Sequence, residues 1–442
     1  MSRYKAYPEY RDSEIEWVGD IPNSWKVTPL FSVASTDVEK NDDGNENNVL
    51  SLSFGKIIRR DVEDNHGLLP ESFNTYQIVD SGDIILRLTD LQNDKRSLRV
   101  GIANEKGIIT SAYLKLTAKV QFLDRYLYRL LHSYDTTKVF YGMGGGLRQS
   151  MKFEEMRRLQ MLCPSFEEQD QIAAFLDHET AKIDALIEKQ QRLIELLKEK
   201  RQAVISHAVT KGLNLNAPMK DSEVEWLGEV PAHWVVRRLK HSATLQSGIP
   251  KGKDLTGKMT IEAPMLRVAN VQDGYLDLSE VHSIQIEPSE LERYSLEYGD
   301  VLMNEGGDND KLGRGTVWKA EITPCIHQNH VFAIRPIEIE PEWLDLVIRA
   351  SYAKYHFYRV AKQSTNLASI SSTNIKETPL VIPPMQERKQ ISLHINQQLE
   401  KFDLLEKNSN LQIELLKERR TALISAAVTG KIDVRGWQPT AA

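Results

Sequence analysis

The 442-residue sequence predicts an α+β fold in which two mixed α/β domains lie in tandem, each followed by a long helix. Two of the observations behind this prediction are repeats. The stretch "DSEIEWVGDIPNSWKVTPL" from Asp12 returns as "DSEVEWLGEVPAHWVVRRL" from Asp221, and a helical stretch from Cys163 returns without a gap from Ile382. The third observation is that short apolar segments typical of β-strands fill the sequence between the repeats. Repeats of this length indicate duplicated domains rather than a solenoid.

The first repeat, which we call the tryptophan segment, begins each globular part. Both copies run from acidic residues through Glu-Trp and Gly to Pro-x-x-Trp. They contain Trp17, Trp25, Trp226 and Trp234 out of seven tryptophans in the chain. Such duplication suggests that the protein recognises something that itself comes in two halves.

The globular parts between the repeats have the pattern of mixed α/β domains. Strand-like segments are "NVLSLSFGKII", "GDIILRLTD" and "AYLKLTA" in the first part, and "APMLRVANV", "GDVLMNEG" and "HVFAIRP" in the second. A Gly-Asp pair precedes one apolar strand in each part, at Gly82 and Gly299. A helical segment then follows, "FLDRYLYRLLHSY" or "EWLDLVIRASYAKYHFYRVA".

The second repeat predicts two long helices, about Glu167–Lys211 and Gln386–Thr429. Their apolar residues recur at spacings of three, four and seven: Ile172, Leu176, Ile183, Leu186, Leu193, Leu197 and Val204, then Ile391, Ile395, Phe402, Leu405, Leu416 and Leu423. A proline precedes each pattern and a glycine, Gly212 or Gly430, ends it. A helix this long with a narrow apolar stripe needs a partner, and its own duplicate is the nearest candidate. Two unrelated helices on separate cores are the alternative.

These patterns divide the chain into five parts. The predicted parts are residues 1–162, the first domain with its tryptophan segment; 163–212, the central long helix; 213–381, the second domain; 382–432, the distal long helix; and 433–442, a C-terminal tail.

Composition narrows the class of protein. Hydrophobic residues make up 41% and charged residues 27%, which suits a globular chain. No apolar run is long enough to cross a membrane, and the N-terminus does not resemble a secretory signal. The two cysteines, Cys163 and Cys325, suggest no disulfide framework. We therefore expect a cytoplasmic protein. The net charge of −6 argues weakly against nucleic-acid binding, but the windows Arg125–Arg158 and Leu346–Lys376 are basic. Each window taken alone is equally consistent with a solvated helix face.

No catalytic or metal-binding motif stands out. The stretch "FYGMGGG" at Phe140–Gly146 resembles the cofactor loop of S-adenosylmethionine-dependent methyltransferases, but it follows a helical pattern rather than a strand, and the corresponding "VAKQSTNLASI" has no glycine. A flexible loop beside a ligand is the simpler interpretation. Neither a phosphate-binding Gly-rich loop with Lys-Ser/Thr nor His-Glu-x-x-His occurs. We therefore expect a non-catalytic chain with no metal site and no cofactor of its own.

The order and duplication of these motifs resemble the specificity subunits of type I restriction-modification enzymes over essentially the whole chain. The pieces that carry the resemblance are "EW-x-G-x-x-P-x-x-W" at Glu16–Trp25 and Glu225–Trp234, "P-x-x-x-E-x-x-Q-I" at Pro164–Ile172, the looser "PPMQERKQI" at Pro383–Ile391, and the "LLKE[KR]R" helix ends. No single piece is very specific, but their order, duplication and spacing together are.

The resemblance implies a function and a set of partners. Each domain would be a target recognition domain that reads one half of a bipartite, asymmetric site in double-stranded DNA. The helices would pair as an antiparallel coiled coil that fixes the unread spacer and docks two modification subunits. Restriction subunits would join them, and S-adenosylmethionine, ATP and Mg would be bound by these partner subunits. The tryptophan segment would be needed wherever a domain begins, and the first copy could close a circle with the C-terminal tail.

Polar and basic loops of each domain supply candidate DNA contacts, because Lys and Arg bind phosphates and Arg, Asn, Gln, Asp and Glu can read base edges. In the first domain the candidates are Arg87, Asn93, Lys95, Arg96, Arg99, Arg148, Gln149 and Lys152. In the second they are Asn304, Asp308, Asn309, Lys311, Arg314, Gln328, Asn329, Lys362, Gln363 and Asn366, with Glu305 in the same loop. Arg148 and Lys152 are expected to hold phosphate, and Asn304 and Asn309 to read bases, with Gln328 and Asn329 as the next candidates.

Two other functions are weighed against this one. A methyltransferase carrying the same recognition domains would need a catalytic domain, for which the chain has no spare length. A stand-alone DNA-binding or coiled-coil adaptor would leave the unequal, basic domains unexplained. Neither the DNA sequence nor the spacer length can be derived from these residues.

Overall fold

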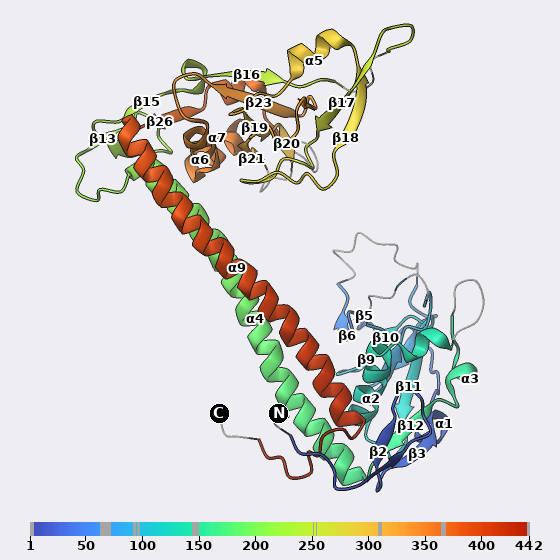
Figure 1. The fold of residues 1–442 in the computed structure, drawn as a ribbon. Coiled ribbons are helices and arrows are strands. Elements are labelled where there is room, and N and C mark those ends of the chain that lie inside the picture. The colour runs from blue at the N-terminus through green and yellow to red at the C-terminus, as the bar shows by residue number, and fades with distance from the viewer. Residues whose placement is uncertain are drawn as a thin grey trace. The chain divides into compact units, whose positions relative to one another are not determined.

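The computed structural model describes residues 4–61, 72–91, 94, 98–143, 150–250, 252, 254–307, 312–363 and 368–439. The chain divides into two compact units (Figure 1). Unit 1 is Met1–Gln190 with Asn410–Ala442, and unit 2 is Gln191–Ser409. Both long helices therefore contribute one segment to each unit.

Unit 1 builds the N-terminal globular part from short strands and helices. Its strands are β1 (Tyr10–Asp12), β2 (Asp20–Pro22), β3 (Lys26–Pro29), β4 (Ala34–Ser35), β5 (Leu50–Ser53), β6 (Lys56–Arg59), β7 (Gln77–Val79), β8 (Ile84–Leu86), β9 (Val100–Ile102), β10 (Gly107–Ile109), β11 (Leu114–Ala118) and β12 (Gln160–Cys163). Its helices are α1 (Leu30–Val33), α2 (Asp124–Thr136), the 3-10 turn η1 (Val139–Gly142), α3 (Phe153–Met156) and the first part of α4 (Phe166–Lys211).

Unit 2 has a similar mixture. Its strands are β13 (Met219–Asp221), β14 (Glu229–Pro231), β15 (Val235–Arg238), β16 (Ala243–Ser247), β17 (Ile261–Leu266), β18 (His282–Ile286), β19 (Val301–Asn304), β20 (Gly306–Gly307), β21 (Gly315–Val317), β22 (Ile326–His327), β23 (Val331–Pro336), β24 (Lys362–Gln363), β25 (Ala368–Ser369) and β26 (Pro379–Ile382). Its helices are η2 (Leu239–His241), α5 (Pro288–Tyr294), α6 (Pro341–Arg349), α7 (Ser351–Val360), α8 (Ser372–Lys376) and the first part of α9 (Met385–Val428). The predicted mixture of helix and strand is confirmed.

The main sheets of the two units have the same strand order. Unit 1 contains β4-β11-β8-β9 and unit 2 contains β16-β23-β19-β21, with antiparallel neighbours throughout. The pairing of β3 with β12 returns as that of β15 with β26. Similar sequence patterns have therefore formed similar sheets, although much of the sequence between the repeats differs.

The repeated Gly-Asp pairs form tight turns against the helix that follows the sheet. Gly82 has φ +96° and Gly299 has φ +91°, a region that favours glycine. A Cβ on Gly82 would lie 2.5 Å from Asp124 Oδ2, and one on Gly299 would lie 3.1 Å from Pro341 Cγ. The aspartate of each pair, Asp83 or Asp300, accepts a hydrogen bond at 2.8 Å from the backbone amide three residues earlier. These turns place the start of each buried strand, β8 or β19, near the first residue of the helix α2 or α6.

The tryptophan segments anchor each globular part to a helix start. Each contains a two-stranded hairpin, β1–β2 or β13–β14, in the same register. In unit 1 the Trp25 indole Nε1–H donates to Glu168 Oε1 at 3.0 Å, near the start of α4. In unit 2 the Trp234 indole donates to Glu387 Oε2 at 3.0 Å, near the start of α9. Both rings are buried, at 1% and 0% exposure. The tryptophan segment is therefore repeated because each unit packs one copy against the start of a long helix.

The glycines that end the long helices lie against the same tryptophans. Gly212 has φ +75° and a Cβ there would lie 3.0 Å from the Trp234 ring; Gly430 has φ +71° and a Cβ there would lie 3.3 Å from the Trp25 ring. The end of one long helix and the start of the other thus meet at each buried tryptophan. Glycine is needed because the left-handed backbone and the nearby ring leave no room for a side chain.

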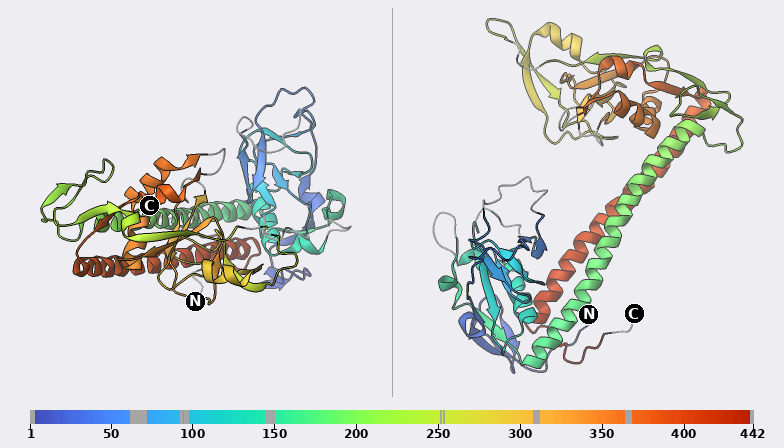
Figure 2. Two further views of the ribbon diagram at one scale, coloured as in Figure 1. Left: turned by 90° about the horizontal axis from the view of Figure 1, so that it is seen from above. Right: turned by 180° about the vertical axis from the view of Figure 1, so that it is seen from behind.

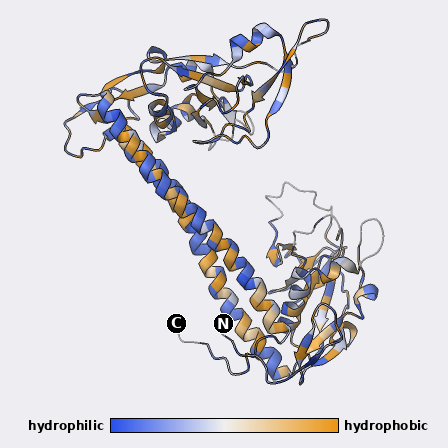
Figure 3. Ribbon diagram, in the orientation of Figure 1, coloured by the Kyte–Doolittle hydropathy of each residue, from blue (hydrophilic) through white to orange (hydrophobic). Residues whose placement is uncertain are grey.

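The long helices end within one residue of the predicted bounds, but their buried stripe is narrower. Ile183, Leu197 and Phe402 are 4 to 7% exposed. Leu186, Leu193 and Leu405, which were predicted in the stripe, are 45%, 38% and 46% exposed, which corrects the prediction. Ile183 and Leu197 lie two heptads apart and are both buried, whereas Leu186 and Leu193 fall beside this line of positions and face solvent. Figure 3 shows hydrophilic and hydrophobic residues alternating along both helices. In the described residues no helix has the length and apolar character that a membrane span requires.

The two ends of the chain meet in unit 1, as the predicted closure of the circle requires. The Asp433 amide donates to Lys5 O at 2.7 Å in an isolated antiparallel bridge. The Tyr10 hydroxyl donates to Gly430 O at 2.9 Å, and the Trp437 ring packs edge-on against Phe175 of α4 at 5.4 Å. Figure 2 shows both terminal segments beside the first turns of α4.

Candidate nucleic-acid interface

In unit 1, the segments that carry the candidates Arg87 and Lys152 come together. The Met151 amide donates to Leu88 O at 2.9 Å, which joins the segment after β8 to the segment before α3. Arg87 and Lys152 lie next to these two residues; the Arg87 side chain is 36% exposed and Lys152 is exposed. The arrangement places two basic side chains from distant parts of the sequence in one region of the unit.

Arg99 has a different role from the one predicted. It is 0% exposed, and its guanidinium donates to the carbonyl oxygens of Arg87, Thr89, Asp90 and Asp94, at 2.5–3.1 Å. Arg99 thus organises the loop from inside, and the prediction that it contacts DNA is corrected. Arg99 was predicted to face DNA because sequence alone does not show which arginine of a basic loop is enclosed by that loop.

A buried carboxylate supports the same loop. The Arg99 amide donates to Asp135 Oδ2 at 2.6 Å, and Asp135 of α2 is 0% exposed. Burial disfavours the charged form and raises the pKa of Asp135 to about 6. The loop that carries Arg87 is therefore attached to α2 through a buried carboxylate.

In unit 2, the segments that carry the candidates Asn304, Gln328 and Lys362 meet at Glu305. The Glu305 amide donates to His330 O at 2.9 Å, which attaches the turn that carries Gln328 and Asn329. The Ile370 amide donates to Glu305 O at 2.9 Å, just after β25. The small sheet β20-β25-β24 completes the junction and holds the exposed Lys362 and Gln363.

Asn304 is a structural residue rather than an exposed reader. It is 3% exposed, and its Nδ2 donates to Val271 O at 2.9 Å and to Val268 O at 3.3 Å. The prediction that Asn304 reads a base edge is therefore corrected, because its amide supports the turn at residues 268–271. Gln328 and Asn329, the next candidates, are partly exposed, and so is Arg314, whose guanidinium donates to Gln272 Oε1 at 3.0 Å.

The remaining candidates lie outside the described residues: Asn93, Lys95, Arg96, Arg148, Gln149, Asp308, Asn309, Lys311 and Asn366.

His330 was missed by the sequence analysis, although its neighbours were chosen. The repeat singles out Glu305 rather than His330, because the Gly-Asp register that aligns Gly82 with Gly299 also aligns Leu88 with Glu305. Each of these two residues accepts a backbone hydrogen bond from the segment before the last strand of its unit.

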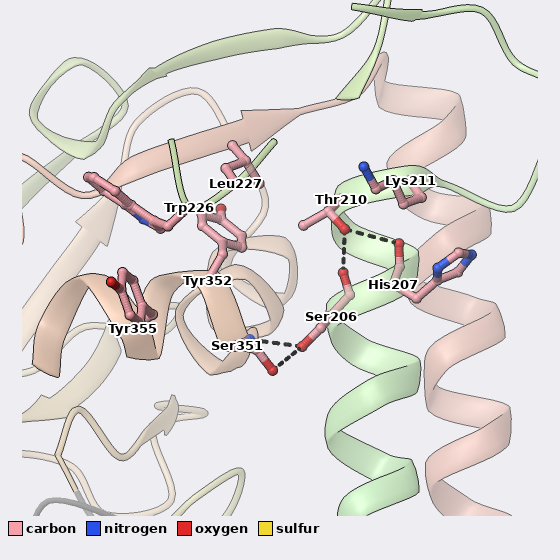
Figure 4. A pocket seen from close by; sticks show the side chains of 9 residues that line it. All are labelled: Ser206, His207, Thr210, Lys211, Trp226, Leu227, Ser351, Tyr352 and Tyr355. Atoms are coloured by element: carbon pink, nitrogen blue, oxygen red, sulfur yellow. Dashed lines mark hydrogen bonds between the residues drawn. The ribbon is translucent and has the colours of Figure 1, made fainter. Parts of the chain in front are cut away.

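A separate cavity of about 550 Å³ lies in unit 2 where α4 meets the globular part (Figure 4). Its lining includes Ser206, Trp226, Ser351 and Tyr355. Ser206 Oγ accepts from the Ser351 amide at 2.8 Å, which attaches α7 to α4. None of the described DNA-contact candidates lines it. Its position indicates a joint between helix and globular part rather than a base-reading site.

The described residues show no constellation for metal chemistry. No group of three or more His, Cys, Asp or Glu side chains among them could hold a metal ion. Phe140 and Tyr141 lie in η1, directly after helix α2, whereas a methyltransferase cofactor loop follows a strand. Among the described residues, Cys163 and Cys325 are both free thiols. What the arrangement offers is a set of polar and basic side chains on loops held by a rigid sheet.

Residues 231–415 match the family described as the type I restriction modification DNA specificity domain. This part of the chain is therefore similar to a DNA specificity domain of this type. In sequence it resembles specificity subunits of type I restriction enzymes. The protein named "Putative type I restriction enzyme MjaX specificity subunit", from Methanocaldococcus jannaschii, is 27% identical over 46% of this chain and 47% of its own length. The EcoKI subunit of Escherichia coli K12 is 24% identical over 62% of this chain and 58% of its own length. The chain thus matches only about half of these relatives' lengths.

Solved structures show a similar fold. The HsdS subunit of Thermoanaerobacter tengcongensis is 15% identical, with a TM-score of 0.51 over 93% of this chain and 98% of its own length. A chain from a study of assembly and conformational transition in a type I restriction-modification system is 17% identical. Its TM-score is 0.62 over 92% of this chain and 98% of its own length.

Proposed function

We propose that this chain is the DNA sequence-recognition subunit of a type I restriction-modification complex. The observation that carries the proposal is the match of residues 231–415 to a DNA specificity domain. The shared strand order of the two main sheets supports two target recognition domains in tandem, within residues 1–162 and 213–381. Each domain reads one half of a bipartite, asymmetric site in double-stranded DNA.

The meeting of loops in each unit supports a reading surface. In both units the segment after the Gly-Asp strand is joined by a backbone hydrogen bond to the segment before the last strand, at Leu88 or Glu305. Side chains on loops fixed to a sheet suit recognition, because little ordering entropy is lost when they contact DNA. Lys152 and Lys362 bind phosphates, and neighbouring polar side chains contact base edges.

The two long helices form an antiparallel coiled coil that sets the spacer between the half-sites. Two ion pairs support this: Asp184 Oδ1 lies 3.0 Å from Arg420 Nε within unit 1, and Arg201 pairs with Asp403 within unit 2. From the first ion pair to the second, the residue number rises on α4 and falls on α9, as expected when the two helices run in opposite directions. The helices also dock two modification subunits, and restriction subunits complete the complex. S-adenosylmethionine, ATP and Mg belong to those partners, and this chain itself is not an enzyme.

Selection from a pool of duplexes with a randomised centre tests the proposal. The full-length chain, alone and with its modification subunits, should enrich two short sequence elements separated by a fixed, unread spacer. Enrichment of one continuous element, or of none, would overturn bipartite recognition. Methyl transfer from S-adenosylmethionine by the chain alone would favour the alternative of a methyltransferase with the same domains. A chain that enriches no sequence but still pairs through its helices would favour the adaptor.

A further inference from the structure

Glu305 has a backbone that is fixed on both sides and a side chain that is not buried. Its amide donates to His330 O and its carbonyl accepts from the Ile370 amide, both at 2.9 Å. The Glu305 side chain is 28% exposed, and Oε2 lies 2.8 Å from His330 Nδ1. The tautomer with a proton on Nδ1 therefore donates to Oε2 and holds the carboxylate in one position.

A carboxylate at this place has a definite binding chemistry. An ionised carboxylate only accepts hydrogen bonds, so it attracts the exocyclic amino group of cytosine or adenine in the major groove. It repels the O6 and N7 acceptors of guanine and the O4 acceptor of thymine. It also repels phosphates, which makes it a poor choice for general DNA affinity. A carboxylate among polar and basic loops thus favours discrimination between bases rather than general affinity for DNA.

The corresponding position of unit 1 lacks this chemistry. Leu88 accepts from the Met151 amide as Glu305 accepts from the Ile370 amide, but Leu88 is 2% exposed and apolar. The backbone needs neither a carboxylate nor an imidazole at this point. Unit 2 therefore adds the Glu305–His330 pair to a backbone arrangement that both units share. Two recognition domains are expected to differ in such added side chains.

We infer that Glu305 is a specificity-determining residue of the half-site read by the second domain, and that His330 is its positioning residue. Glu305 selects a base pair that presents an amino group in the major groove. The inference rests on the proposed function and adds to it one named reader and the class of base that it recognises.

The test compares Glu305→Gln with the wild-type chain on the randomised duplex pool. Glutamine keeps the shape but adds two donors and removes the charge. The preference at one base pair of one half-site should fall by at least about fivefold, while the other half-site stays unchanged. Binding to unselected DNA at low salt should become stronger, because a negative charge has been removed. Because the backbone bonds of Glu305 remain, the Tm should not change.

A matched control lies in the same unit. His282 Nε2 is 2.8 Å from Glu280 Oε1, and both side chains are exposed, but neither adjoins the junction at Glu305. Glu280→Gln removes the same charge and should leave every base preference unchanged. Equal changes for the two variants would show that only net charge matters and would overturn the inference.

The role of His330 is tested by rescue. His330→Leu removes the donor and should reduce the same base preference, whereas His330→Asn keeps a donor near the Nδ1 position and should restore it. A loss that Asn does not restore would show that His330 does not act through its hydrogen bond. If the wild-type chain enriches a bipartite site and Glu305→Gln leaves that site unchanged, the inference fails and the proposed function stands. If the wild-type chain enriches no sequence, the proposed function fails first.

Discussion

The buried tryptophan of each unit provides a quantitative test of why the tryptophan segment is repeated. Trp25→Phe removes the indole N–H that donates to Glu168 Oε1 at 3.0 Å, and leaves Tyr7, whose hydroxyl donates to the same oxygen at 2.6 Å. Glu168 is 7% exposed, so water cannot replace the lost donor. A hydrogen bond to a charged group contributes about 1.5 to 3 kcal/mol, and we expect a loss of about 2 kcal/mol in unit 1.

The same substitution should be milder in unit 2. Trp234 donates to Glu387 Oε2 at 3.0 Å, but the Glu387 side chain is 26% exposed and also contacts His233. Water can replace part of the lost bond, so Trp234→Phe should cost about 1 kcal/mol, which is below the range for a charged acceptor and within that of a typical hydrogen bond. The smaller ring affects both sites alike and cancels in the comparison.

Hydrogen–deuterium exchange, read on peptides of the hairpins β1–β2 and β13–β14, measures both effects separately. A loss of about 2 kcal/mol speeds exchange roughly 30-fold, and about 1 kcal/mol roughly fivefold. Trp17→Phe is the control, because Trp17 lies in the same segment but is 44% exposed. If Trp17→Phe speeds exchange as much as Trp25→Phe, or if Trp25→Phe has no effect, the buried hydrogen bond does not anchor the segment.

Three further predictions concern the helices, pH and DNA affinity. Leu197→Asp should disrupt the helix pairing and lower the Tm, because Leu197 is only 7% exposed and the new charge would be buried. Leu193→Asp should have little effect, because Leu193 is 38% exposed. Similar Tm changes for the two variants would show that Leu197 does not lie in the contact between the helices. Asp135 has a pKa raised to about 6 in the folded chain against an ordinary value of 3.8, so the folded chain binds this proton more tightly than the unfolded chain. Its contribution to stability is therefore complete below about pH 4 and decreases by about 1.4 kcal/mol per unit until about pH 6. Urea denaturation should show this decrease in the wild-type chain and its absence in Asp135→Asn; parallel pH profiles would refute it. Lys152→Ala and Lys362→Ala should each weaken binding to selected and scrambled duplexes equally, and each should reduce the salt dependence of DNA affinity by about one unit of slope. A loss of affinity confined to the selected duplex would show that these lysines read bases instead.

The sequence by itself determined the elements whose signal is local and repeated. The long helices were predicted as Glu167–Lys211 and Gln386–Thr429 and are found at Phe166–Lys211 and Met385–Val428, because periodicity, proline and glycine all act within a few residues. The Gly-Asp turns were visible for the same reason. The meeting of the chain ends was expected from the family resemblance, and the Asp433 amide and the Lys5 carbonyl make that contact.

Only the tertiary structure decided which side chains of these elements are available. Arg99 and Asn304 lie in polar loops that look alike in sequence, yet both are enclosed by carbonyl groups of their own units. Glu305 becomes a junction because the His330 carbonyl and the Ile370 amide reach its backbone from distant segments. Burial and hydrogen bonding depend on which parts of the chain meet, and that depends on packing of the whole unit rather than on the residues beside a given position.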